Sequence, residues 1–203
     1  MAFWTCPAEW LGSTVWIVGG GPSLAAADLK PLEGRRVIAV NSAIGKVPFS
    51  DFLVFGDSRW FFHNYPLVKR FKGRIVSLAP AVRDDRCLVM RKVPPPPGLV
   101  EERDGLAMRY TSFQAGINLA VHLGAARLVF LGLDGKELDG RTHHHDPHPW
   151  PQRPNCWALQ YDCIKSTVKP LRKRGIDVIN ANPGSTYDWW RKEPLEKCLV
   201  QYA

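Results

Sequence analysis

Four of the six histidines in this 203-residue chain gather in one short segment. They are His143, His144, His145 and His148. Imidazole titrates near neutrality, so such a segment can supply a general base or a general acid. Imidazole is also a common metal ligand, and Asp146 adds a carboxylate to the His-x-His spacing. A chance histidine run in a polar loop is the third interpretation. The sequence favours acid–base chemistry, with no bound metal, and leaves the other two interpretations open.

A glycine-rich turn near the N-terminus could hold a phosphate group. The apolar run Val15–Val18 leads into Gly19, Gly20, Gly21, Pro22 and Ser23, and small helix-forming residues follow. Glycines let the main chain turn sharply and approach a ligand closely. The following helix N-terminus would supply unpaired N–H groups and a positive dipole end. Proline suits the first helical position. We therefore predict a nucleotide- or phosphate-binding turn, with a ligand-free strand-to-helix turn as the alternative.

This turn departs from the dinucleotide fingerprint at two positions. Leu24 stands where the third glycine would be, and the second predicted strand is followed by Asn41 in place of an acidic ribose ligand. The departures argue against NAD and favour a mononucleotide or a nucleotide-activated donor.

The elements that must position these residues follow an α/β pattern. Short apolar runs alternate with helical or loop segments, which is typical of a Rossmann-like, mostly parallel sheet with helices on both faces. We predict one domain over residues 1–203 with about six strands. They are Val15–Val18, Val37–Val40, Phe52–Phe55, Ile75–Leu78, Leu128–Leu131 and Val178–Asn180.

Three helices are predicted between these strands. Residues 24–29 form a short helix that Pro31 stops. Ser112 caps a second helix, which Gly124 ends. A third helix places Trp157, Tyr161, Ile164, Val168 and Leu171 on one face, contains Pro170, and ends at Gly175.

Two further stretches bear on the site. Asp57 follows the third predicted strand, where ligands bind in open α/β sheets, although it could equally cap a helix. Residues 81–110 carry mixed charge and four consecutive prolines. Such a run fits neither a central strand nor a helix interior, so we predict an inserted loop or lid.

Composition narrows the class of protein. The formal net charge is +8, from 27 basic and 19 acidic residues, which favours phosphorylated ligands or polyanionic partners, including nucleic acid. The five cysteines are scattered and odd in number, as expected for reduced thiols. No apolar run is long enough to span a membrane and no secretion signal is visible, so we expect a cytoplasmic location.

The motifs resemble those of the bacterial family 42 sialyltransferases and the related archaeal 6-hydroxymethylpterin diphosphokinase-like proteins. The turn at 18–24 is similar to their G-x-G-P-S-L motif, and Leu131–Asp134 to their strand end. Residues 111–124 match one of their helices in length, with Phe113 in place of a glycine. Residues 182–185 are similar to their C-terminal turn. The chain also looks like small stand-alone members found in bacteriophage genomes.

The resemblance implies a glycosyltransferase that uses a nucleotide-activated sugar and no required cofactor. In the family, an H-Y-x-G-H loop supplies the general base. Residues 144–148 share that spacing, so His148 takes this role and His145 occupies the tyrosine position. The implied nucleotide-binding residues are Gly19, Gly20, Gly21, Pro22, Ser23, Asn41, Asp57, Thr111, Ser112, Asp134, Asn182, Gly184 and Ser185.

Two alternative functions stay open. One is diphosphoryl transfer from ATP, with magnesium held by Asp57, Asp134 and Asp146. The other is a catalytically silent nucleotide-binding module that docks a partner through its basic surface and residues 187–190. The acceptor is not identified by the sequence, and a homo-oligomer is possible.

Overall fold

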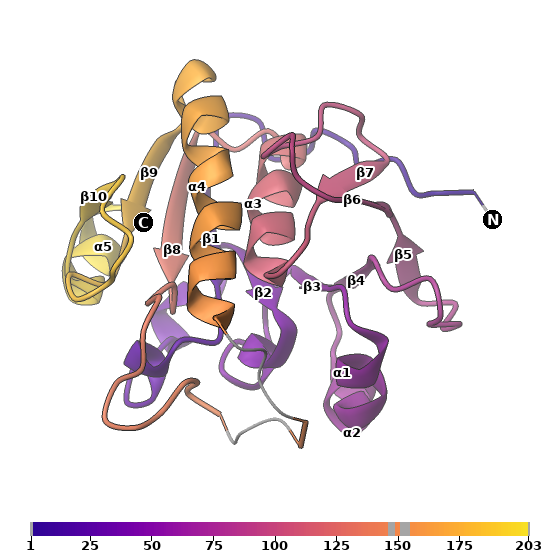
Figure 1. Cartoon of the computed structure of the whole chain (residues 1–203), viewed down its shortest axis with the longest axis horizontal. Helices are drawn as coiled ribbons and strands as arrows, with labels where there is room; N and C mark the ends of the chain where they lie inside the picture. Colours follow the sequence, from indigo (N-terminus) through magenta and orange to yellow (C-terminus); the bar gives the residue numbers. More distant parts are fainter. Residues whose placement is uncertain (1, 146–148, 151–154, 203) are drawn as a thin grey trace.

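Eight parallel strands form one twisted sheet in the computed structural model, which describes residues 2–145, 149–150 and 155–202 (Figure 1). Their order across the sheet is β10-β9-β8-β1-β2-β3-β4-β5, so the first strand lies at the centre. The strands are β1 (Thr14–Val18), β2 (Arg36–Val40), β3 (Phe52–Phe55), β4 (Arg74–Ser77), β5 (Cys87–Val89), β8 (Arg127–Leu131), β9 (Asp177–Asn180) and β10 (Arg191–Lys192).

The α/β class and the mostly parallel sheet are confirmed, and all six predicted strands are present to within one residue. The sheet has eight strands because β5 and β10 extend its two edges. These two strands are only three and two residues long. They lack the long apolar run that marks a strand buried on both faces.

Helices cover both faces of the sheet. Side chains alternate along β1, so Val15 and Ile17 enter one apolar cluster while Trp16 and Val18 enter the other. The first cluster packs against α3 (Ser112–Leu123) and α4 (Cys156–Lys173). The second packs against α1 (Ser58–His63), α2 (Tyr65–Arg70), α5 (Leu195–Gln201) and the 3₁₀ turns η1 (Pro22–Leu24), η2 (Lys30–Leu32) and η3 (Asn41–Gly45).

Two local predictions were wrong. No α-helix covers residues 24–29, because the chain makes the single 3₁₀ turn η1 and then a second one, η2, that contains Pro31. The cap of α3 is Thr111, whose hydroxyl accepts a hydrogen bond from the N–H of Phe113 at 3.2 Å. Gly124 ends this helix in the left-handed region, with φ of 99°, as predicted.

The segment 81–110 contributes three strands: β5 at the sheet edge, and β6 (Arg91–Val93) with β7 (Gly105–Ala107) in a separate two-stranded sheet. Its second half is attached to α3. The buried Asn118 accepts hydrogen bonds from the N–H groups of Val100 at 2.8 Å and Ala107 at 3.0 Å. One turn further along, the ring of His122 contacts the carbonyl of Gly105 at 2.9 Å. Whether this segment moves as a lid stays a prediction.

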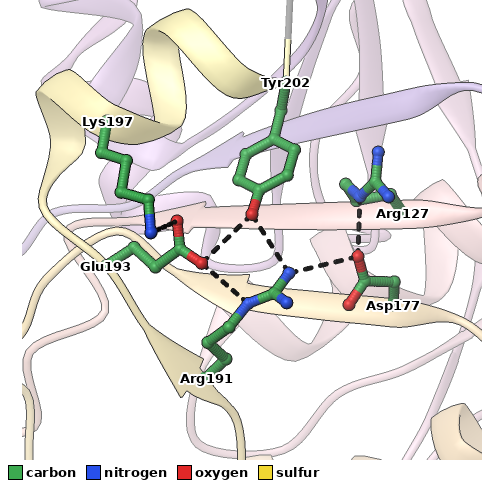
Figure 2. A network of polar contacts seen from close by, with 6 residues as sticks. All are labelled: Arg127, Asp177, Arg191, Glu193, Lys197 and Tyr202. Carbon is green, nitrogen blue, oxygen red and sulfur yellow. Dashed lines mark hydrogen bonds and ion pairs between the residues drawn. The ribbon is translucent and has the colours of Figure 1, made fainter.

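The C-terminal helix α5 is joined to the sheet by a polar network (Figure 2). The buried Glu193 accepts a hydrogen bond from the Tyr202 hydroxyl at 3.1 Å and pairs with Arg191 at 2.9 Å. The network consists of Arg127, Asp177, Arg191, Glu193, Lys197 and Tyr202. It fixes the last helix beside β9 and β10, at the opposite edge of the sheet from α1 and α2 (Figure 1).

Within the described part of the chain, no helix combines the length and the apolar character needed to cross a membrane.

Candidate functional site

A cavity of about 820 Å³ lies where the parallel strands end. Its lining includes the glycine turn after β1, Asn41 after β2, Asp57 after β3 and Asp134 after β8. The carboxyl ends of parallel strands share one edge of a sheet, and ligands bind there in open α/β folds. The volume suits a ligand of nucleotide-sugar size.

Many of the residues predicted from the sequence meet in this cavity. Those that line it are Gly19, Gly20, Gly21, Asn41, Asp57, Thr111, Ser112, Asp134 and His145. Those that do not line it are Pro22, Ser23, Asn182, Gly184 and Ser185. The predicted base His148 and the carboxylate of Asp146 lie outside the described residues.

The buried carboxylate of Asp134 joins three strand ends. Its side chain accepts hydrogen bonds from the main-chain N–H of Ser23 at 2.7 Å, the Ser23 hydroxyl at 2.7 Å and the Asn182 amide at 2.8 Å. These partners follow β1 and β9, while Asp134 follows β8. Ser23 and Asn182 therefore hold in place the side chain of Asp134, which lines the cavity.

The glycine turn has few hydrogen-bond donors left for a ligand. The N–H groups of Gly19 and Gly21 donate to carbonyls at the end of β8, at 2.8 and 3.0 Å. Proline has no N–H, and the N–H of Ser23 is taken by Asp134. Among residues 19–23, only Gly20 has an N–H group without a partner in the described part of the chain. The carboxylate of Asp134 thus occupies the position that a bound phosphate would take at the start of η1.

The last two glycines of the turn face in different directions. A Cβ atom on Gly21 would lie 2.5 Å from the carbonyl oxygen of Gly132 and 2.6 Å from the Asp134 carboxylate. Packing inside the protein is therefore sufficient to explain why glycine stands at position 21. A Cβ atom on Gly20 would lie 3.2 Å from the ring of His143 and 3.8 Å from that of His145. The side of Gly20 on which a Cβ atom would lie therefore faces the rings of His143 and His145.

The histidine segment is attached to the glycine turn. The main-chain N–H of His144 donates to the carbonyl of Gly20 at 3.0 Å. His143 and His145 both line the cavity, and their rings stack with centroids 4.8 Å apart. The Thr142 hydroxyl lies 2.9 Å from Nδ1 of His143, which fixes the orientation of that ring.

His144 differs from its two neighbours because its ring is turned into the protein. Burial lowers the pKa of its imidazole to about 4, and the nearby charge of His145 acts in the same direction. Its Nε2 is buried without a hydrogen-bond partner in the described part of the chain. His144 is therefore neutral at pH 7, and its contacts position the segment.

Asn41 combines two features that are typical of ligand-binding residues. Its φ angle is 52°, in the left-handed region that few residues other than glycine adopt without cost. Its Oδ1 is buried and has no partner among the described residues. A buried amide oxygen that lines a cavity is an acceptor for a ligand hydroxyl or amino group.

The helix-cap interpretation of Asp57 is confirmed, and the ligand-binding interpretation stays a prediction. Its carboxylate caps α1 by accepting a hydrogen bond from the Arg59 N–H at 2.9 Å, and it also lines the cavity. The Arg59 guanidinium pairs with it at 2.9 Å. These hydrogen bonds hold the pKa of the Asp57 carboxyl below its usual value, with that of the Arg59 side chain contributing most.

The metal interpretation of the histidine segment is not tested, because Asp146 and His148 lie outside the described residues. They contain no group of three or more His, Cys, Asp or Glu side chains placed to hold a metal ion. The two predicted magnesium ligands within this part of the chain, Asp57 and Asp134, are both engaged with protein donors.

Comparison with known proteins identifies a shared fold. No family model matches the sequence, and no curated protein matches it. The structure is similar to the MAf glycosyltransferase of Magnetospirillum magneticum, with a TM-score of 0.64 and 17% identity over 95% of this chain. It is also similar to the sialyltransferase CstII of Campylobacter jejuni solved with cytidine-5′-monophosphate, with a TM-score of 0.57 and 15% identity over 91% of this chain.

The lengths of the two neighbours differ. This chain spans 35% of the MAf glycosyltransferase and 86% of CstII. A second CstII structure, with CMP-3FNeuAc, matches with a TM-score of 0.52 and 14% identity. At these identities the likeness shows that the fold is one used by glycosyltransferases.

Several cavity residues were not anticipated from the sequence. They include the cations Lys92, from β6, and Arg109, and the aromatic residues Tyr110 and Trp157. Arg109 and Tyr110 immediately precede the predicted helix at 112, so their position could have suggested them. Lys92 lies in an irregular charged stretch, where nothing in the sequence indicates which side chains reach the site.

Proposed function

We propose that this protein is a glycosyltransferase that moves a sugar from a nucleotide-activated donor to an acceptor hydroxyl. The observation that carries the proposal is the meeting of the glycine turn, Asn41 and two histidines in one cavity at the carboxyl edge of the sheet. The shared fold supports it, because two of the CstII structures contain CMP or a CMP-sugar analogue.

The donor nucleotide would lie over the ends of β1 and β2. The unpartnered Oδ1 of Asn41 would accept a hydrogen bond from the ribose, and the Gly20 N–H would contact the phosphate. Ser112 and Thr111, at the start of α3, would lie beside the sugar. Lys92 and Arg109 add positive charge to the same cavity, which favours an anionic ligand.

His148 would act as general base on the acceptor. The acceptor oxygen attacks the anomeric carbon and loses its proton to the imidazole, while the bond from that carbon to the phosphate oxygen breaks and its electron pair leaves with the phosphate. A positioned base contributes roughly 10² to 10⁴ in rate. This role comes from the family resemblance of residues 144–148.

The two alternatives have less support. Magnesium-dependent diphosphoryl transfer needs free carboxylates, whereas those of Asp57 and Asp134 are paired or hydrogen-bonded within the protein. A docking module would need exposed aromatic residues at 187–190, whereas Tyr187 and Trp190 are buried in the core.

The proposal is tested in two steps. Nucleotides and nucleotide sugars are first screened by thermal shift, because a ligand that binds only the folded state raises its melting temperature. Turnover is then measured with the donor found. His148→Ala should lower turnover by roughly 10² with donor affinity nearly intact, whereas the control His63→Ala, an exposed histidine on α1, should keep normal turnover.

Three outcomes count against the proposal. The absence of any nucleotide ligand would overturn it. Full turnover in His148→Ala would remove the base mechanism. Turnover that requires magnesium and releases a diphosphorylated product would favour the diphosphotransferase.

A further inference from the structure

The segment that contains α1 and α2 is rich in basic residues. Between Asp57 and Asp84 the chain has six basic residues and no acidic one. Two of the six are paired with a carboxylate, since Arg59 contacts Asp57 and Arg74 contacts Glu9. The remaining positive charge of the segment is concentrated at the end of α2.

Three exposed cations at the end of α2 have no carboxylate partner. Lys69 and Arg70 lie in the last turn of the helix, and Lys72 follows it. Their side chains form no hydrogen bond or ion pair with another residue in the described part of the chain. Their charge is therefore available to an anionic partner.

Two exposed aromatic side chains adjoin these cations. Phe62 is 62% exposed and Tyr65 is 41% exposed. Their rings contact the ring of the buried Phe61, with centroid distances of 5.5 and 5.6 Å. Tyr65 lies four residues before Lys69, which places both side chains on one face of α2. Cations at a helix C-terminus complement its dipole, but the dipole does not explain the exposed rings.

We propose that this α1–α2 face docks the protein on an anionic lipid bilayer. The exposed side chains that form the face are Phe62, Tyr65, Lys69 and Arg70. Aromatic rings insert at the boundary between headgroups and acyl chains, while lysine and arginine attract anionic headgroups. The inference goes beyond the proposed function and does not depend on it.

The position of the α1–α2 face favours a bilayer over nucleic acid. Basic and aromatic residues also bind single-stranded nucleic acid, which follows a groove in which its bases stack. None of the four residues lines the cavity, and α1 and α2 lie at the periphery of the molecule, beyond the carboxyl ends of the strands (Figure 1). An outward-facing helix pair suits an extended surface.

Docking through this face has a consequence for the cavity. Asp57, Ser58 and Arg59, at the start of α1, line the cavity. Phe62 follows Arg59 by three residues, which is about one helical turn. A substrate carried on the membrane surface would therefore reach the cavity from the side of α1.

The experiment measures binding to lipid vesicles by sedimentation. One set of vesicles contains phosphatidylcholine alone, and the other contains phosphatidylcholine mixed with phosphatidylglycerol. Wild type is compared with the double variant Lys69→Ala/Arg70→Ala and with Phe62→Ala, at low and high salt. Single-stranded DNA is tested as the competing ligand.

Two matched controls remove the same groups from other surfaces. Lys165→Ala/Lys169→Ala takes two exposed lysines from α4, which packs against the opposite face of the sheet. Leu11→Ala removes an apolar side chain that is 76% exposed. The controls separate the α1–α2 face from the effects of net charge and of exposed apolar area in general.

We expect wild type to bind the mixed vesicles, more weakly at high salt, and not to bind phosphatidylcholine alone. Lys69→Ala/Arg70→Ala should lose about 25-fold in affinity, from about fivefold for each cation. Phe62→Ala should lose about tenfold and keep the salt dependence of wild type, because it removes apolar contact only. Both controls should bind like wild type.

Three results would overturn the inference. Wild type that does not bind the mixed vesicles would exclude the bilayer. An equal loss in Lys165→Ala/Lys169→Ala would assign the binding to net charge and not to this face. Binding to single-stranded DNA without binding to vesicles, lost in Lys69→Ala/Arg70→Ala, would assign the face to nucleic acid. None of these results bears on the proposed function, which the nucleotide screen tests separately.

Discussion

Two polar regions of this protein use similar residues in opposite ways. On α3, the side chains of Asn118 and His122 are buried and hydrogen-bonded to main-chain groups of residues 100–107. Near the cavity, Asn41 and His144 each carry a buried polar atom that has no partner among the described residues, and of the two only Asn41 lines the cavity. Asn118 and His122 therefore have a structural role, because the protein itself supplies their hydrogen-bond partners.

An unpartnered atom does not mark a site by itself. Ser50 and Trp190 also carry one, in the packed interior. Asn41 differs because it also lines the cavity and has a left-handed main chain. The comparison teaches that a polar residue points to a ligand when the missing partner, the open space and the unusual backbone coincide.

The largest effect is expected from the satisfied region. Asn118→Leu leaves the N–H groups of Val100 and Ala107 and the carbonyl of Val100 without partners. Each buried unsatisfied group costs about 1–3 kcal/mol, so the free energy of unfolding should fall by about 4 kcal/mol. Urea denaturation measures it. A loss below about 1 kcal/mol would show that water replaces Asn118 and that residues 98–107 are loosely held.

The two glycines test the boundary between packing and cavity. Gly21→Ala places a methyl group against the Gly132 carbonyl and Asp134, so stability should fall by about 2–3 kcal/mol. Gly20→Ala meets only the histidine rings, at 3.2 Å or more. It should leave stability within about 0.5 kcal/mol and weaken nucleotide binding. Thermal unfolding measures the stability of both variants, and calorimetry measures their nucleotide affinity. Equal losses of stability in the two variants would contradict the conclusion that Gly21 faces the protein interior and Gly20 faces the histidine rings.

His144 should make stability depend on pH. Its pKa in the folded state is lowered to about 4, so between about pH 4 and 6.5 the unfolded chain binds the extra proton. The free energy of unfolding therefore contains the full contribution of His144 above pH 6.5. It falls by on the order of 2 kcal/mol as the pH drops toward 4. The measurement is unfolding free energy against pH for wild type and His144→Leu. The variant should lose part of this slope, and His122, whose pKa burial also lowers, accounts for part of what remains. Identical slopes would show that His144 is solvated.

The smallest effect concerns Asn41. Glycine tolerates the φ of 52° and removes the amide, so Asn41→Gly should keep the fold and lower nucleotide affinity about 10-fold. Calorimetry with the best nucleotide from the thermal-shift screen measures it. The control is Asn64→Gly, outside the cavity. Unchanged affinity would return Asn41 to a purely structural role.

The sequence predicted the fold well because its main signal is burial on both faces. Each of the six central strands is a short apolar run, and that pattern follows from the helices above and below. The edge strands β5 and β10 were missed because they are short and partly exposed. Residues 24–29 were predicted to be helical from composition alone, but they are too few to keep a helix without a packed face.

The sequence predicted where the site lies better than it predicted which way the side chains point. Alternation of strands and turns brings Gly20, Asn41, Asp57 and Asp134 to one edge, and a sequence shows that order. It does not show where a side chain points. Ser23 was expected to face a ligand, whereas the structure turns it toward Asp134 across more than a hundred residues of chain.

The edges of the sheet have a consequence for behaviour at high concentration. An open edge of a sheet can add a strand from another molecule, which is a common route to aggregation. The β10 edge is only two residues long and both are basic, Arg191 and Lys192. At the β5 edge, the N-terminal segment crosses over and the N–H of Trp4 donates to the carbonyl of Val89 at 2.7 Å. One edge is short and charged and the other is covered by the N-terminal segment. Both edges of the eight-stranded sheet therefore offer few main-chain groups to which a strand of another molecule could bind.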